Sequence, residues 1–194
     1  MIFSKKTQVF QGDYHVRLKP NASNNLTDVY LFNDPAGSEV FFKTIPNVYR
    51  DHYHVAEFSN GNLYIIERTG DANDMKSQNW TDELWKFGSK DNGTKLYSAK
   101  GIDFRVSLET GEIAIFSQSD TKKVLDTSIV IMDLSGKVLK MFAGSSLSGM
   151  DNSKALTPLF WQNDIFWFTA SQGSQITDTY TFDSKDQTIT KRSK

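Results

Sequence analysis

Short runs of apolar and β-branched residues alternate with polar turn clusters along the whole chain. No segment keeps apolar residues at helical spacing for three turns, so the pattern predicts strands throughout. The clusters include Asn60-Gly61-Asn62, Lys90-Asp91-Asn92-Gly93 and Ser135-Gly136. Such residues tolerate the positive φ angles that tight hairpins need. The predicted fold class is therefore all-β.

The runs also recur at a fixed period. Strands of one type begin near Asp13, Asn62, Glu112 and Asp164, at spacings of 49, 50 and 52 residues. A second apolar run follows each of them, at 29–32, 84–87, 129–132 and 179–182. Weaker outer runs come next, at 39–42, 94–97, 137–140 and 187–190. Runs at 55–58, 104–107 and 159–161 precede the later three first-type strands. The chain is thus predicted to be one domain, 1–194, of four modules at about 1–46, 47–100, 101–152 and 153–194.

Four antiparallel strands per module form a β-meander of the propeller-blade type. The runs at 113–116 and 165–168 are continuously apolar, as expected of strands that bury both faces between neighbouring blades. We therefore predict a β-propeller-like fold of four four-stranded antiparallel meander modules, with at least twelve strands and no helix longer than about two turns. A β-sandwich with coincidental spacing is the alternative.

One module resembles a known repeat. Residues 100–115, KGIDFRVSLETGEIAI, followed by Ile131-Met132-Asp133-Leu134-Ser135-Gly136-Lys137, resemble the TolB-type β-propeller repeat. In that repeat a Ser-Pro-Asp-Gly turn leads into an apolar strand, and a later strand ends in Met-Asp-x-x-Gly. Here Leu108 and Glu109 replace the Pro and Asp, and Thr110 is inserted before Gly111. The resemblance implies a blade, which concerns fold rather than function. TolB-type propellers usually have six blades, more than the four modules here.

Composition removes several functional classes. The 194 residues include 22 basic and 23 acidic side chains, a net charge of −1, and no cysteine. Without cysteine there is no disulfide scaffold, thiolate nucleophile or iron–sulfur cluster. A near-neutral chain lacks the basic charge that neutralises phosphates, so no nucleic-acid partner is predicted.

The sequence also allows a prediction of the cellular compartment of the protein. No window approaches the roughly 20 uncharged apolar residues of a membrane span, so none is predicted. Residues Met1 to Lys6 contain no apolar leader. We expect a bacterial, extracytoplasmic protein, periplasmic, cell-surface or secreted, whose leader is not part of this sequence. A cytoplasmic location is the alternative.

Metal and cofactor signals are sparse. In Asp51-His52-Tyr53-His54 the two imidazoles would point to one face of a strand, which makes His52 and His54 metal-ligand candidates. A third ligand is needed, and only His15 or Glu57 is at hand; the other reading is two histidines making ordinary hydrogen bonds. Asp71-Ala72-Asn73-Asp74 starts like a calcium loop, but Met75 holds the fifth position and no glycine follows. No metal or cofactor is predicted.

The predicted site lies where the long connections gather. If the modules are blades, one end collects the links 47–52, 100–103 and 144–152 and the loops 69–81, 117–126 and 171–177. A ligand at that end would meet Tyr49, Arg50, His52, Trp80, Asp103 and Arg105. Trp80, in the polar loop, is either an exposed anchor or part of a loop folded over its own blade.

Two functions follow from this arrangement. The preferred prediction is a non-catalytic binding module that holds a protein, peptide or glycan. The alternative is a propeller hydrolase or lyase, in which Asp103, Arg105 and the two histidines supply acid/base and anion-holding groups. Arg105 is expected to pair with Asp103 or with a carboxylate of a neighbouring blade, because an unpaired guanidinium away from water is costly. We therefore expect its role to be structural first and functional second.

Overall fold

The structure is a computed structural model that describes residues 14–21, 26–33, 37–46, 53–70, 80–117, 127–151 and 153–192, without the side chains of 53 and 54. These residues form fifteen strands and one short 3-10 helix, η2 (Gly144–Ser146). All strand pairs are antiparallel. For this part of the chain, the prediction of at least twelve strands and no long helix is confirmed.

The strands form four sheets in chain order, called blades 1 to 4 here. Blade 1 holds β1 (His15–Asn21), β2 (Leu26–Phe32) and β3 (Val40–Ile45). Blade 2 holds β4 (Tyr53–Ser59), β5 (Asn62–Gly70), β6 (Trp80–Phe87) and β7 (Thr94–Ala99). Blade 3 holds β8 (Asp103–Val106), β9 (Glu112–Ser117), β10 (Ser128–Asp133) and β11 (Val138–Ala143). Blade 4 holds β12 (Ala155–Gln162), β13 (Ile165–Gln172), β14 (Gln175–Asp183) and β15 (Thr188–Arg192).

Blade 1 differs from the predicted four-stranded module. Its three described strands correspond to the second, third and outer strands of the later blades. The innermost position, which β4, β8 and β12 occupy in the other blades, has no strand among the described residues. A four-stranded first module is therefore not confirmed.

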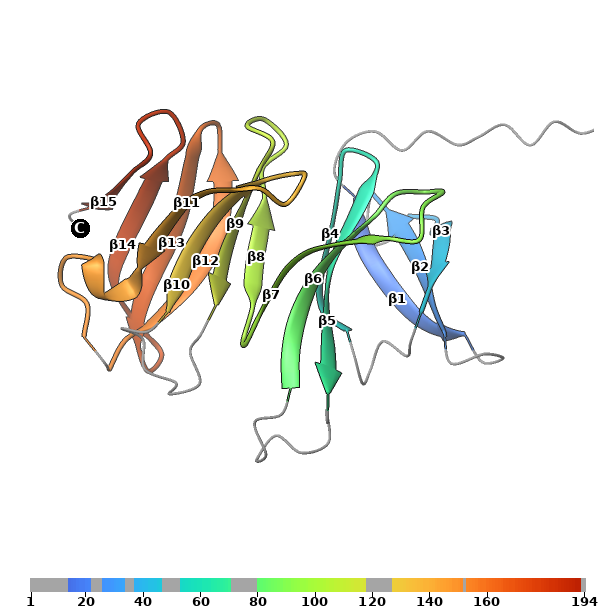
Figure 1. Ribbon diagram of the computed structural model, residues 1–194, viewed down its shortest axis with the longest axis horizontal. Coiled ribbons are helices and arrows are strands. Elements are labelled where there is room, and N and C mark those ends of the chain that lie inside the picture. The colour runs from blue at the N-terminus through green and yellow to red at the C-terminus, as the bar shows by residue number, and fades with distance from the viewer. Residues whose placement is uncertain are drawn as a thin grey trace, which may run out of the picture.

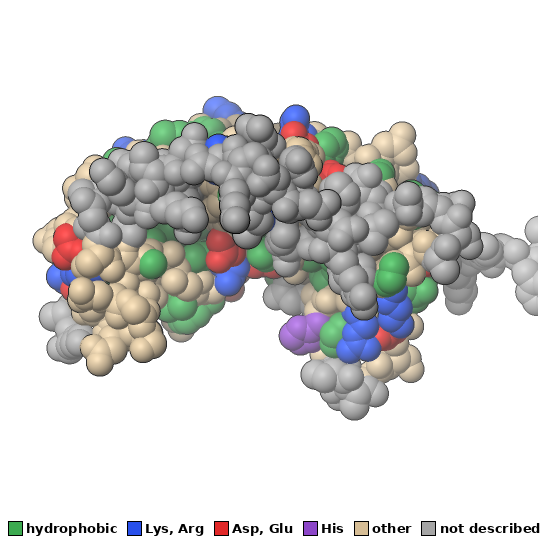
Figure 2. Space-filling model, turned by 90° about the horizontal axis from the view of Figure 1, so that it is seen from below, with side chains coloured by type: hydrophobic (Ala, Val, Ile, Leu, Met, Phe, Trp, Pro, Cys, Tyr) green, Lys and Arg blue, Asp and Glu red, His purple; other side chains and the backbone are tan. Residues whose placement is uncertain are grey.

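The blades stand side by side and form an open arc. In Figure 1 they follow one another from blue to red, with blades 1 and 4 at opposite ends. The inner strand β8 contacts both β4 and β12, and β4 also contacts β1. Seen from below, the molecule is hollowed on one side (Figure 2). The fold is thus propeller-like, without a closed ring in the part of the chain that is described.

Each pair of neighbouring blades shares a hydrophobic core. On β5, Leu63 and Ile65 pack towards blade 1, whereas Tyr64 and Ile66 pack towards blade 3. All four side chains are fully buried. Because successive strand residues point to opposite faces, a strand buried between two blades reads as a continuous apolar run. The same holds for β9, whose alternate residues serve the cores between blades 2 and 3 and between blades 3 and 4.

The turns follow the predicted clusters, with one exception. Asn60 and Gly61 have φ angles of 47° and 77° and join β4 to β5 in a tight hairpin. The expected long loop at 171–177 is wrong, since Gln172 pairs with Gln175 across a short turn. Gly173, with φ of 58°, makes this turn possible because glycine adopts positive φ without a steric penalty.

Candidate functional site

Arg105 lies on the inner strand of blade 3 and joins three blades. Its Nη1 donates to Asp103 Oδ1 at 2.9 Å, within the same strand. Its Nε donates to the backbone oxygen of Leu159 in blade 4 at 2.9 Å. Nη1 also lies 3.6 Å from Glu57 Oε1 of blade 2. The predicted pairing of Arg105 with Asp103 or a neighbouring carboxylate is therefore confirmed.

Further hydrogen bonds hold the same strand from both sides. Glu57 Oε2 accepts a hydrogen bond of 2.9 Å from the backbone N–H of Val106. From the other side, Trp161 Nε1 donates to the backbone oxygen of Arg105 at 3.2 Å. The short strand β8 is thereby fixed by side chains of both neighbouring blades.

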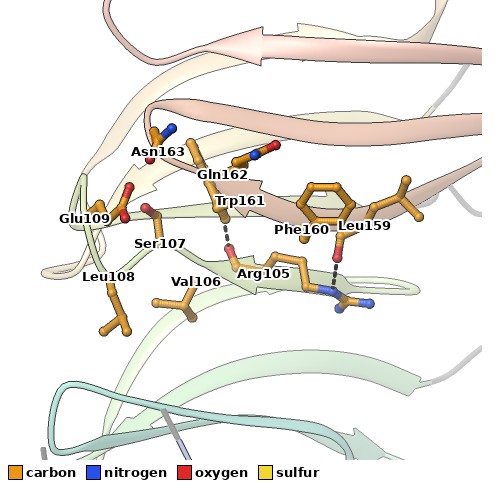
Figure 3. Close-up of a pocket in the computed structure, with 10 residues that line it drawn as sticks. All are labelled: Arg105, Val106, Ser107, Leu108, Glu109, Leu159, Phe160, Trp161, Gln162 and Asn163. Atoms are coloured by element: carbon orange, nitrogen blue, oxygen red, sulfur yellow. Dashed lines mark hydrogen bonds between the residues drawn. The ribbon is translucent and has the colours of Figure 1, made fainter. Parts of the chain in front are cut away.

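A cavity of about 450 Å³ opens beside Arg105, between the inner strands β8 and β12. Figure 3 shows Arg105 along its floor, with Trp161 and Phe160 from β12 on the opposite side. Ser107 and Glu109 of the β8–β9 turn close one end. Phe160, which also lines the cavity, is 49% exposed, and its ring stacks on that of Trp167 in β13 with centroids 6.3 Å apart.

The electrostatics of this cavity favour a neutral or weakly polar ligand. The positive charge of Arg105 is balanced by Asp103 and Glu57. The Arg105 side chain is nevertheless 30% exposed, and its Nη2 makes no hydrogen bond to the described residues. Arg105 therefore offers a hydrogen-bond donor of fixed orientation, because its other nitrogens are already held.

A second cavity of about 480 Å³ lies between the first two blades. Tyr14, His15 and Phe32 line it from blade 1, and Glu57 and Phe58 line it from blade 2. Val106 borders both cavities. The two cavities are therefore neighbours on the inner side of the arc, at the ends of β4, β8 and β12.

Only part of the predicted site can be located. Asp103 and Arg105 lie together, as expected from their spacing on one strand. Tyr49, Arg50 and His52 lie outside the described residues, as do much of the predicted long-loop end and the side chain of His54. Both cavities open towards the opposite end, where the short β4–β5, β8–β9 and β12–β13 turns lie.

Trp80 does not sit in a loop. It is the first residue of β6 and pairs with Gly70 of β5. The guanidinium carbon of Arg68 lies 4.0 Å from the centre of its ring, and the indole is only partly exposed. The loop prediction for Trp80 is thus wrong, and its packing over its own blade matches the alternative reading.

Metal binding has no support from the placed side chains. The described residues contain no group of three or more His, Asp or Glu side chains arranged to hold an ion. His52, His54 and the Asp71–Asp74 segment fall outside that description. Whether these residues bind a metal therefore stays a prediction from the sequence.

Phe160, Trp161 and Glu57 line the cavities but were not predicted as site residues. Phe160 and Trp161 belong to an apolar run that is read as core, and Glu57 was considered only as a third metal ligand. An aromatic pair at the end of a strand, just before the polar Gln162 and the Asn163-Asp164 turn, is the signal that points to an accessible position. Contacts across blades leave no local signal in the sequence.

Membrane insertion by a helix finds no support, since no helix in the described part of the chain is long and apolar enough to span a bilayer.

Comparisons with known proteins support the fold alone. No protein-family model matches the chain, and no curated protein sequence matches it. The β-propeller domain of the Trilobed protease from Pyrococcus furiosus, described as having an open velcro topology, is similar at a TM-score of 0.57 and 14% identity, with 95% of this chain covering 55% of that one. Pyrococcus horikoshii acylaminoacyl peptidase matches at 0.52 and 13% identity, over 93% and 30% of the two chains. Saccharomyces cerevisiae Sqt1 matches at 0.49 and 9% identity, over 94% and 48%. The chain therefore spans between about a third and just over half of these proteins, and what it shares with the first two is the propeller fold.

Proposed function

We propose that this chain is a non-catalytic binding module that holds a peptide segment of a partner protein in the cavity between β8 and β12. One observation carries the proposal: Arg105 presents an Nη2 that makes no hydrogen bond to the described residues, in a cavity whose lining also includes the exposed Phe160. A guanidinium donor in a charge-balanced site suits a peptide carbonyl. An exposed aromatic ring suits an apolar side chain, and such rings are frequent anchors in interfaces.

The rigidity of the cavity favours binding. Arg105 is held by partners on three blades, so little side-chain entropy remains to be lost when a ligand binds. The cavity volume of about 450 Å³ is in the range of sites that hold a small ligand or a few side chains.

A hydrolase is the second candidate, and the cavity supports it less well. Asp103 and Glu57 both contact Arg105, so both carboxylates are already engaged in ion pairs. Glu109 is the remaining carboxylate in the lining.

The TolB-type resemblance and an extracytoplasmic bacterial location complete the proposal. TolB-type repeats are blades, which agrees with the propeller-like fold. The location rests on that resemblance, and fractionation of the source cells followed by immunoblotting tests it. A glycan ligand is an outcome of the binding test below rather than part of the proposal.

A selection experiment tests the binding function. A phage-displayed random heptapeptide library is selected on the purified chain, and an enriched peptide is labelled and titrated by fluorescence anisotropy. Phe160→Ala should weaken binding by about tenfold or more, as for a central interface anchor. Ile176→Ala, an equally conservative truncation of a 58% exposed residue on β14, should leave binding unchanged.

Three results would overturn the proposal. Peptides that bind wild type and Phe160→Ala equally place the site elsewhere. If the selection enriches no peptide and the chain binds to a glycan array, the ligand is a sugar. Cleavage of the bound peptide, seen by mass spectrometry and lost in Glu109→Gln, makes the protein a hydrolase.

A further inference from the structure

The outer strand of blade 3 carries an unusual concentration of exposed apolar side chains. On β11, Val138 is 43% exposed, Leu139 40% and Met141 56%. These are three of the seven large hydrophobic residues that are exposed in the described part of the chain. Since β11 is the outer edge of its sheet, apolar side chains and a free backbone edge occur together.

The other outer strands are built differently. The exposed residues of β7 are Thr94, Lys95 and Ser98, and those of β15 are Thr188, Thr190, Lys191 and Arg192. Charged and polar side chains on an edge discourage pairing with another chain. On β3 only Phe41 is both large and exposed, and it packs edge-on against Tyr30. Among the four outer strands, only β11 exposes three large apolar side chains, with Lys140 as the one charged residue between them.

Part of the outward-facing backbone of β11 has no hydrogen-bond partner among the described residues. Gly144 N donates to Thr127 O at 2.7 Å, and Phe142 is in register with Ile129. Hydrogen-bonded pairs alternate with non-bonded pairs in an antiparallel ladder. The N–H and C=O groups of Met141 and the N–H of Ala143 therefore point away from β10, towards an incoming strand, whereas the Ala143 oxygen already accepts a hydrogen bond from Ser146 Oγ at 2.6 Å.

The two faces of this edge differ in chemistry. Val138 and Met141 are in register with Met132 and Val130, which belong to the core shared with blade 2. Lys140 is in register with Ile131, on the opposite face. The strand has no acidic residue, and Lys137 precedes it directly. A strand paired with β11 would thus meet the apolar Val138 and Met141 on one face, and the positive charge of Lys140 beside the partly buried Phe142 on the other.

We propose that β11 is a docking edge for an extended strand of a partner protein that carries apolar residues on one face and acidic residues on the other. Backbone hydrogen bonds would supply affinity, and alternate side chains would supply specificity. Charge complementarity favours such a partner over a second copy, because antiparallel pairing of two β11 strands brings their lysines together. This edge is on the outer rim of blade 3 and does not depend on the cavity beside Arg105.

The probe is an end-blocked, labelled heptapeptide of alternating Val and Glu. Anisotropy titrations compare it with the matching Val–Lys peptide and with a Val–Glu peptide that has proline at its centre. We expect saturable binding of the Val–Glu peptide that weakens with added salt, and at least about fivefold weaker binding of both controls. Lys140→Glu should reverse the preference, so that the Val–Lys peptide binds better.

Hydrogen exchange supplies an independent readout. The bound Val–Glu peptide should slow amide exchange at Met141 and Ala143, whose N–H groups point outward, and leave Phe142, already bonded to β10, unchanged. Phe160→Ala should not alter either result, which separates this edge from the cavity.

Other outcomes would overturn the proposal. Equal binding of both charged peptides, or an unchanged preference in Lys140→Glu, removes the charge complementarity. Absence of protection at Met141 and Ala143 removes the strand pairing. A dimer in sedimentation equilibrium that Lys140→Glu strengthens or weakens makes the occupant a second copy rather than a partner strand.

Discussion

Glu57 of blade 2 accepts a 2.9 Å hydrogen bond from the backbone N–H of Val106 in blade 3. Its other carboxylate oxygen lies 3.6 Å from Arg105 Nη1. One carboxylate therefore satisfies both a backbone donor and a guanidinium across the boundary between two blades. Because β8 has only four residues, such contacts from neighbouring blades contribute to holding the strand in place.

Arg105→Ala should destabilise the fold. The substitution removes the hydrogen bonds to Leu159 and Asp103 and the ion pair with Glu57. Hydrogen bonds to charged groups contribute about 1.5–3 kcal/mol, and the partial exposure of Arg105 places the expected loss towards the lower end. The melting temperature should fall by roughly 3–8 °C for a chain of this size, as measured by differential scanning calorimetry.

The control is an exposed ion pair of the same charge type. Lys185, 74% exposed, pairs with Asp164 on blade 4, and Lys185→Ala should change the melting temperature by less than about 1–2 °C. Arg50→Ala, in the predicted link, is likewise expected to have little effect. If Arg105→Ala melts like wild type and loses only peptide binding, Arg105 serves the site rather than the scaffold.

Asp82→Ala should be more damaging. Asp82 is 1% exposed, and its carboxylate pairs with Arg68 through two hydrogen bonds of 2.8 and 3.1 Å. It also accepts a hydrogen bond from the backbone N–H of Ile102 in the link to blade 3. Removing one partner of a buried pair costs about 3–5 kcal/mol because the other charge is left behind.

Urea unfolding measures this loss. The adjacent Glu83 offers a matched control, because its carboxylate pairs with Lys95, whose side chain is 49% exposed. Glu83→Gln should cost less than about 1 kcal/mol. Equal effects of the two substitutions would contradict a special role for the buried carboxylate.

Much of the architecture is predictable because it is local or periodic. Strand positions follow from runs such as Ile113 to Phe116, whose side chains are all buried between two blades. The turn at Asn60-Gly61 follows from residues that tolerate positive φ. The repeat of these signals about every 50 residues predicts blades before any contact is known.

The site is less predictable because it is assembled across blades. Arg105 and Asp103 are two residues apart on one strand, so their pairing can be anticipated. The contacts with Leu159 and Glu57 join residues about fifty positions apart, and nothing local specifies them. The sequence predicts a loop at Trp80 because a run of polar residues precedes it, whereas β6 begins at this residue.

Tyr64 and Tyr180 should respond in opposite ways to loss of the hydroxyl. Tyr64 is fully buried, its hydroxyl has no hydrogen-bond partner among the described residues, and burial raises the pKa of Tyr64 to about 12. Tyr180 donates a 2.8 Å hydrogen bond to the backbone oxygen of Ser148. Tyr64→Phe should therefore be neutral or stabilising by up to about 1 kcal/mol, and Tyr180→Phe destabilising by about 0.5–1.5 kcal/mol.

Chemical denaturation of the two variants at pH 7 checks this pair. Both substitutions remove one oxygen and keep the ring, so packing changes are matched. A loss of stability in Tyr64→Phe equal to that in Tyr180→Phe would mean that the Tyr64 hydroxyl is satisfied after all.

Asp178 should make the stability of blade 4 depend on pH. Its carboxylate pairs with Lys154 at 2.8 Å and with Lys191 at 2.6 Å, and its side chain is 10% exposed. Hydrogen bonds from Lys154 and then Lys191 hold the pKa of Asp178 well below its ordinary value. The same pair raises the pKa of Lys154.

The direction of this pH effect on stability follows from the linkage between proton binding and folding. A carboxylate whose pKa is lowered on folding stabilises the native state above its unfolded pKa, about 4, and that contribution is lost as the pH falls through the lower folded value. Asp178→Asn removes this contribution. Wild type should thus exceed Asp178→Asn in stability at pH 7, with a difference that shrinks steadily below about pH 4.

Urea midpoints of both proteins, measured from about pH 7 down to about pH 2, test the prediction. Asp164→Asn is the control, since Asp164 pairs with the exposed Lys185 and should differ little from wild type at any pH. Lys154→Met should show the same pH trend as Asp178→Asn, because it leaves the carboxylate with Lys191 alone and brings its pKa closer to the ordinary value. A wild-type advantage that stays constant down to pH 2 would contradict the ionic account and leave only a packing role for Asp178.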